Sequence, residues 1–125
     1  MMGIMNRLAN CHNRFQGPER RVLCVCSAGL LRSPTAAWVL SNPPFLFNTR
    51  AAGIDPEFAL IPVDQVLLEW ADTIVCMTED QRIDLEQMME EDQKPILCLG
   101  IEDSFERMNP ELIERIIAGC QSLLK

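Results

Sequence analysis

Short apolar runs alternate with segments of helical pattern along most of the chain, and this alternation constrains the fold more than any other feature. Each run is too short for a buried helix and ends near a glycine, proline or polar capping residue. We expect strands at Val22–Val25, Phe45–Ala52, Thr73–Met77 and Pro95–Leu99. Continuously apolar strands separated by helices are typical of a parallel sheet covered on both faces. The sequence therefore predicts an α/β fold of three layers.

Capping residues and apolar spacing place helices after each of these strands. Ser33-Pro34 opens the first, Thr78 caps the third and Asn109-Pro110 opens the last. The second helix is expected over Pro62–Ala71, and the third ends near Glu91. The side chains expected to face the sheet follow a helical period: Val63, Val66, Leu67 and Trp70 in the second helix, Ile83, Leu85 and Met88 in the third, and Leu112, Ile113, Ile116 and Ile117 in the last.

The bulk properties fit one globular domain. The chain has 125 residues, of which 48% are hydrophobic, and a net charge of −7. We expect a loosely ordered arm over residues 1–19 and a single domain over 20–125. The negative charge opposes nucleic acid or an anionic membrane as partner. No apolar run approaches the ~20 residues of a membrane span and no signal-peptide layout is present, so we expect a cytoplasmic protein.

Six cysteines and a lone histidine bear on disulfides and metals. Cys24, Cys76 and Cys98 lie inside apolar runs, where a thiol behaves as a small buried hydrophobe. We therefore expect core thiols and no disulfide framework. His12 lies in the arm, so no histidine-ligated metal site is expected. We predict no metal and no cofactor.

The loop after the first strand carries the chemistry. Cys26 and Arg32 lie six positions apart between a buried strand and a helix start, with Gly29 able to take an unusual backbone conformation. Backbone N–H groups in such a loop converge on an oxyanion, and the helix end adds a positive dipole. Arg32 can grip two phosphate oxygens at once. These groups favour a nucleophilic Cys26 thiolate. The expected phosphate-binding residues are Ser27, Ala28, Gly29, Leu30, Leu31, Arg32 and Ser33.

These residues resemble the low-molecular-weight protein tyrosine phosphatases, whose signature is Cys-x5-Arg-Ser after a valine-rich strand. The match is close over Val22–Ala37, and weaker echoes follow in order at Ala51-Ala52-Gly53, at 71–77 and at Ile101-Glu102-Asp103. The segment from 101 to 113 is similar to a compact bacterial and phage branch of predicted tyrosine phosphatases. The resemblance implies a four-stranded parallel sheet of order 2-1-3-4.

The resemblance also implies a role for each matching residue. Cys26 attacks phosphorus, Arg32 binds the phosphoryl oxygens, Ser33 hydrogen-bonds the sulfur, and Asp103 protonates the leaving phenolate and later activates water. The substrate is a phosphorylated protein, with phosphotyrosine favoured, or a small phosphomonoester. Two other acids compete with Asp103: Asp55, in an Asp-Pro pair after the second strand, and Glu102.

Several residues depart from the family pattern. Gly29 and Ala51 stand where the family has an Asn and a Ser that brace the loop, so we expect a looser loop. The chain has no tyrosine, which leaves Phe105, and secondarily Phe58, to wall the substrate pocket.

Two other functions compete with the phosphatase interpretation. An arsenate reductase would need two further cysteines, and Cys76 and Cys98 lie on different predicted strands, far apart in sequence. A catalytically weak oxyanion-binding or regulatory module is the alternative outside enzymes.

Overall fold

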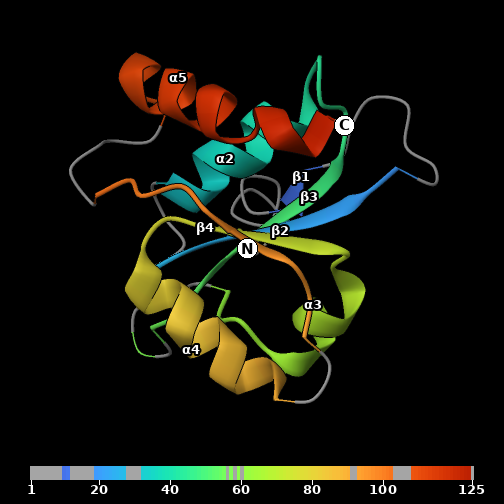
Figure 1. The fold of residues 1–125 in the computed structure, drawn as a ribbon, viewed down its shortest axis with the longest axis vertical. Helices are drawn as coiled ribbons and strands as arrows, with labels where there is room; N and C mark the ends of the chain where they lie inside the picture. Colours follow the sequence, from blue (N-terminus) through green and yellow to red (C-terminus); the bar gives the residue numbers. More distant parts are fainter. Residues whose placement is uncertain are drawn as a thin grey trace, which may run out of the picture.

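The structure is a computed structural model. It describes residues 10–11, 19–27, 32–55, 57, 59, 61–90, 93–102 and 108–124. A central sheet is covered on both faces by helices, so the predicted three-layer α/β architecture is confirmed (Figure 1).

The sheet has the predicted strand order. Its parallel strands are β2 (Arg21–Cys26), β3 (Asn48–Gly53), β4 (Thr73–Cys76) and β5 (Ile96–Cys98). They lie in the order β3-β2-β4-β5, which is 2-1-3-4 in chain order. A two-residue strand, β1 (Asn10–Cys11), pairs antiparallel with the outer side of β3. The sequence predicted no strand in this segment.

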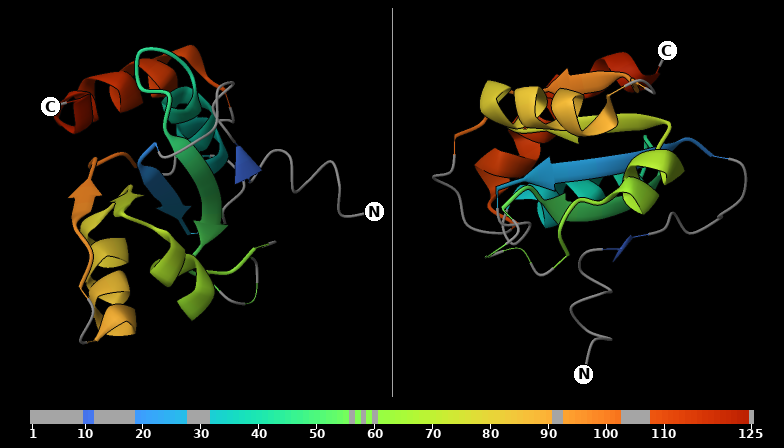
Figure 2. Two further views of the ribbon diagram at one scale, coloured as in Figure 1. Left: turned by 90° about the vertical axis from the view of Figure 1, so that its right-hand side faces the viewer. Right: turned by 90° about the horizontal axis from the view of Figure 1, so that it is seen from below.

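Two hydrophobic clusters, one on each face of the sheet, bind the helices to it. Alternate residues of β2 point to opposite faces, so Val22 and Cys24 join one cluster while Leu23 and Val25 join the other. The first cluster includes residues of α2 (Arg32–Ser41) and α5 (Pro110–Gly119), and the second includes residues of α3 (Gln65–Trp70) and α4 (Glu79–Met89). Figure 2 shows the two helix pairs on opposite sides of the sheet. A 3-10 helix, Gln121–Leu124, follows α5.

The caps of the third and last predicted helices are confirmed. Thr78 and Gln81 form a reciprocal capping box at the start of α4. Asn109 caps α5 by accepting from the N–H groups of Glu111 and Leu112. Ser33, in contrast, lies within α2, which begins at Arg32, and its buried hydroxyl faces the sheet.

Two residues that were predicted to face the core are exposed, so these predictions are wrong. Val66 is 69% exposed and Ile83 is 48% exposed. In α3 the buried pair is Leu67 and Leu68, and in α4 Leu85 and Met89 are buried. Because α3 has only six residues, its periodic pattern does not fix which side faces the sheet; packing against the strands does.

The predicted start of the second strand is also wrong. Phe45 and Phe47 lie in the core but precede β3. The Phe45 N–H donates to the Asn42 carbonyl and the Phe47 N–H to the Leu40 carbonyl. These turn hydrogen bonds occupy backbone groups that a strand would use in its ladder.

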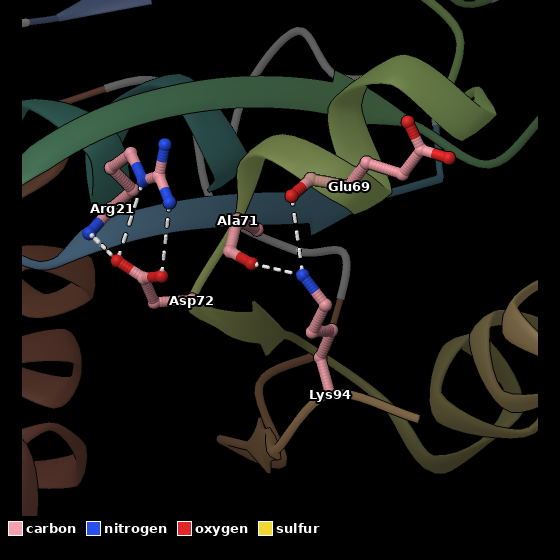
Figure 3. Close-up of polar contacts among 5 residues, drawn as sticks. All are labelled: Arg21, Glu69, Ala71, Asp72 and Lys94. Atoms are coloured by element: carbon pink, nitrogen blue, oxygen red, sulfur yellow. Dashed lines mark hydrogen bonds and ion pairs between the residues drawn. The ribbon is translucent and has the colours of Figure 1, made fainter. Parts of the chain in front are cut away.

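Charged groups connect the amino ends of the strands (Figure 3). Arg21 donates from its backbone N–H and its guanidinium to the Asp72 carboxylate, at 3.0 to 3.4 Å. Lys94 Nζ donates to the carbonyls of Ala71 and Glu69, at 2.7 and 3.2 Å, where α3 ends. The links between α3, β4 and β5 are thus tied together at the amino edge of the sheet.

In the part of the chain that the structure describes, no helix is both long and apolar enough to cross a bilayer.

Candidate active site

The predicted loop begins at the carboxyl end of β2. Cys26 is the last residue of this strand, it is 3% exposed, and its register partner on β3 is Gly53. The chain runs from β2 to β3 on one side and reaches β4 on the other, so strand order reverses at β2. Open parallel sheets bind their ligands beyond the carboxyl ends of the strands at such a reversal. Cys26 therefore lies where this fold most readily forms a site.

Ser33 contacts the Cys26 sulfur, as the resemblance implied. The Cys26 Sγ donates to the Ser33 Oγ at 3.2 Å, and the Ser33 hydroxyl donates to the Ala52 carbonyl at 3.4 Å. When the thiol loses its proton, the hydroxyl can turn and donate to the sulfur instead. The pair can thus accommodate both the thiol and the thiolate form of Cys26.

Arg32 lies at the first position of α2 and is 2% exposed. Its Nη1 donates to the Ile101 carbonyl at 2.6 Å, and the Ile101 N–H donates to the Met77 carbonyl at 2.8 Å. The guanidinium is thereby held against the segment that leaves β5. The planar guanidinium of an arginine can bind two oxygens of a phosphate at once.

Ser27 and Arg32 face a common cavity of about 470 Å³. Arg32 is the cationic residue among the described lining, while Asp55, Asp80 and Asp84 are carboxylates. In the described lining, Arg32 supplies the positive charge that attracts an anion, the hydroxyls of Ser27 and Thr78 can donate to it, and the three carboxylates repel further negative charge. The described lining consists of Ser27, Arg32, Ile54, Asp55, Thr78, Asp80, Gln81 and Asp84.

The structure brings together four of the predicted site residues: Cys26, Ser27, Arg32 and Ser33. The rival acid Asp55 lies at the same cavity, whereas Glu102 is exposed and is not among the described lining residues. The other predicted residues lie outside the described part of the chain: Ala28, Gly29, Leu30, Leu31, Asp103, Phe105 and Phe58.

Sequence reasoning missed Gln81, which lines the cavity and bonds Ser27. A signal was present, because a Gln three residues after the Thr78 cap is the pattern of a capping box.

Cys76 and Cys98, far apart in sequence, are register partners on β4 and β5. Burial, with a smaller effect of Cys98, raises the pKa of Cys76 to about 12. Burial also raises the pKa of Cys98. Both thiols are therefore protonated and weakly nucleophilic at neutral pH.

Among the residues that the structure describes, no group of three or more His, Cys, Asp or Glu side chains is placed to hold a metal ion.

Comparison with protein-family models gives no match, and comparison with curated protein sequences gives none. Solved structures do match. Wzb of Vibrio vulnificus, in complex with benzylphosphonate, has 20% identity and a TM-score of 0.65, covering 84% of this chain and 97% of its own. The tyrosine phosphatase Wzb of Escherichia coli K30, in complex with phosphate, has 13% identity and a TM-score of 0.65, covering 84% and 96%.

The YwlE arginine phosphatase of Geobacillus stearothermophilus is also similar, with 20% identity and a TM-score of 0.57 over 83% of this chain and 85% of its own. At these identities the similarity establishes the fold.

Proposed function

We propose that this chain is a cysteine-dependent phosphatase of the low-molecular-weight tyrosine phosphatase type. The observation that carries the proposal is the joint placement of Cys26, Ser33 and Arg32. The sulfur lies 3.2 Å from the Ser33 hydroxyl at the carboxyl end of a parallel strand, and Arg32, the residue before Ser33, is buried at the start of α2 and lines the adjoining cavity. A core cysteine would need neither the hydroxyl nor the guanidinium.

The proposed reaction has two steps. The Cys26 thiolate attacks phosphorus, the bond from phosphorus to the leaving oxygen breaks, and Asp103 gives that oxygen its proton. Water then attacks the cysteinyl-phosphate, Asp103 takes a proton from the water, and the sulfur leaves as a thiolate. Ser33 stabilises the thiolate at the start and end of the cycle. Arg32 holds the phosphoryl oxygens, whose charge the transition state redistributes.

The substrate we favour is phosphotyrosine in a protein or a small phosphomonoester, with Phe105 and Phe58 as pocket walls. The similar structures include one named as a tyrosine phosphatase and one named as an arginine phosphatase, so this fold serves more than one phosphorylated side chain. The carboxylates of Asp55, Asp80 and Asp84 at the cavity favour a cationic group beside the phosphate. Phosphoarginine is therefore the second substrate to test. We propose a cytoplasmic enzyme that needs no cofactor.

The register pairing of Cys76 with Cys98 favours arsenate reduction as a second candidate function, because adjacent thiols can relay a disulfide. Their raised pKa values oppose this role. Replacing both by serine distinguishes the functions: a phosphatase keeps its activity, and a reductase loses its arsenate turnover.

The deciding experiment is p-nitrophenyl phosphate turnover against pH, with chelator present, for the wild type, Cys26→Ser and Asp103→Asn. We expect chelator-resistant activity that Cys26→Ser abolishes and Asp103→Asn strongly lowers. A folded wild type that binds phosphate or vanadate without turnover would instead be an oxyanion-binding module. Phosphotyrosine and phosphoarginine peptides of otherwise equal sequence then identify the preferred substrate.

A further inference from the structure

Gln81 is a buried glutamine whose amide forms hydrogen bonds through both its oxygen and its nitrogen. It is 4% exposed and lies in the first turn of α4. Its Oε1 accepts from the backbone N–H groups of Met77 and Thr78, at 2.8 and 3.1 Å. Because both of these partners are donors, the oxygen must face them, and the amide NH2 must point the other way. The orientation of the side chain is thus fixed by the end of β4.

The NH2 group of Gln81 points to the candidate active site. Its Nε2 donates to the Ser27 Oγ at 3.2 Å, and Ser27 is the residue that follows Cys26. On the opposite side, the Asp55 N–H donates to the Ser27 carbonyl at 2.8 Å, and the Ile54 N–H donates to the Cys26 carbonyl at 3.0 Å. The start of the loop is therefore held from both neighbouring strands: by backbone from the β3 side and by one side chain from the β4 side.

We propose that Gln81 is a positioning residue that acts through Ser27 to fix the Cys26 nucleophile. This inference rests on the proposed phosphatase function. In-line attack requires the sulfur to be held to within a fraction of an ångström, and such precision comes from groups behind the reacting atom. The β3 side cannot supply a side-chain brace from Ala51 or Ala52, which are apolar. Gln81 supplies one from the β4 side.

The test is a double-mutant cycle of Ser27→Ala and Gln81→Met, with Gln93→Met as the matched control. Ser27→Ala removes the acceptor of the Gln81 amide together with one hydroxyl of the cavity lining, whereas Gln81→Met removes the donor to Ser27 and the acceptor for two backbone N–H groups. Because that second loss is present in both backgrounds, the cycle isolates the contact between Gln81 and Ser27. Gln93 bonds only backbone carbonyls near the end of α4 among its described contacts, so its replacement controls for a generic Gln→Met change.

We expect Ser27→Ala to lower kcat about two- to tenfold, the effect of one hydrogen bond, while KM changes less than about twofold. The double variant should match Gln81→Met in kcat to within about twofold, because the same contact is already lost. Gln93→Met should leave kcat unchanged. The proposal would be overturned if Ser27→Ala left kcat unchanged, or if the fold-loss in kcat of the double variant equalled the product of the two single losses. The measurement on Ser27→Ala alone decides if Gln81→Met fails to fold.

The same double-mutant cycle can be measured without turnover, as the affinity of the wild type and the three variants for inorganic phosphate in a calorimetric titration. A folded wild type that binds phosphate but hydrolyses nothing would refute the phosphatase function, and coupled losses of phosphate affinity would still support Gln81 as the residue that positions the loop. Independent losses of affinity would refute Gln81 alone. A folded wild type that neither binds phosphate nor turns over substrate would refute both.

Discussion

The two edges of the parallel sheet place their polar groups in opposite environments. At the amino edge Arg21 and Asp72 form an ion pair in which each side chain is 47% exposed (Figure 3). At the carboxyl edge Arg32 is 2% exposed, and Cys26 and Ser33, which contact each other, are also buried. Exposed pairs are solvated and contribute little, whereas buried polar groups cost stability unless each is satisfied. We therefore expect substitutions at the carboxyl edge to change activity and substitutions at the amino edge to change only stability.

The largest effect is expected at Cys26. Cys26→Ser should lower p-nitrophenyl phosphate turnover at least about 10⁴-fold, because a serine hydroxyl is not ionised near neutral pH. The matched control is Cys98→Ser, whose thiol pKa is raised by burial and which should keep turnover within about twofold. If Cys98→Ser lowered turnover as much as Cys26→Ser, the result would contradict the assignment of Cys26 as the nucleophile.

The next effect separates the two candidate acids. Asp103→Asn should lower kcat about 10²- to 10⁴-fold, the usual contribution of a general acid, and should remove one limb of the pH profile. Asp55→Asn should change kcat much less, because the Asp55 carboxylate accepts from the Glu57 N–H and holds its own loop. If Asp55→Asn gives the larger loss, the acid comes from the β3 side of the cavity.

Replacing Arg32 by lysine tests whether catalysis requires a guanidinium at this position or only a positive charge. Arg32→Lys keeps the charge but loses bidentate geometry and the 2.6 Å bond to the Ile101 carbonyl. We expect kcat to fall about 10²- to 10³-fold, as for the loss of a transition-state donor. A lysine variant with near-normal kcat would show that charge alone suffices. Circular dichroism should show that the variant is folded.

A smaller effect is expected from the three carboxylates that line the cavity, those of Asp55, Asp80 and Asp84. Asp84→Asn removes one carboxylate from a site that must accept an anion, so kcat/KM for p-nitrophenyl phosphate should rise about two- to threefold at low salt. The gain should vanish near 0.5 M salt, where charges are screened within several ångströms. Asp72→Asn, at the other edge, removes the same charge and should give no gain.

The smallest effect is expected for the Arg21–Asp72 pair. Hydrogen bonds from Arg21 lower the pKa of Asp72 below the ordinary value of an aspartate. A depressed carboxylate pKa stabilises the fold above the unfolded pKa, and this contribution disappears as pH falls through the folded value. Asp72→Asn should lower the free energy of unfolding by at most about 1 kcal/mol at pH 7, with unchanged kcat. The free energies of unfolding of the two proteins, measured with denaturant, should converge as pH falls through the lowered pKa of Asp72, and a gap that persists once the carboxylate is protonated would point to packing instead of charge.

The element types could be predicted because they depend on local patterns, whereas the strand order was an expectation from the family resemblance. The apolar run at Val22–Val25, the Thr78 cap and the Asn109-Pro110 helix start each report on adjacent residues. Helix faces were less predictable: Val66 fits an apolar period but is exposed. The sequence also predicted a looser loop from Gly29 and Ala51, and did not foresee that Gln81 bonds Ser27 from the first turn of α4.

What the sequence by itself determined is the chemistry available at one loop: a strand that ends in Cys26, an arginine six positions later, and a helix that begins there. Chain connectivity holds these groups close whatever the rest of the fold does. What only the tertiary structure decided is which distant residues meet them. Gln81 reaches Ser27 across 54 positions and Arg32 reaches Ile101 across 69. Such contacts depend on strand order and register, which are set by packing of the whole sheet and leave no local pattern in the sequence.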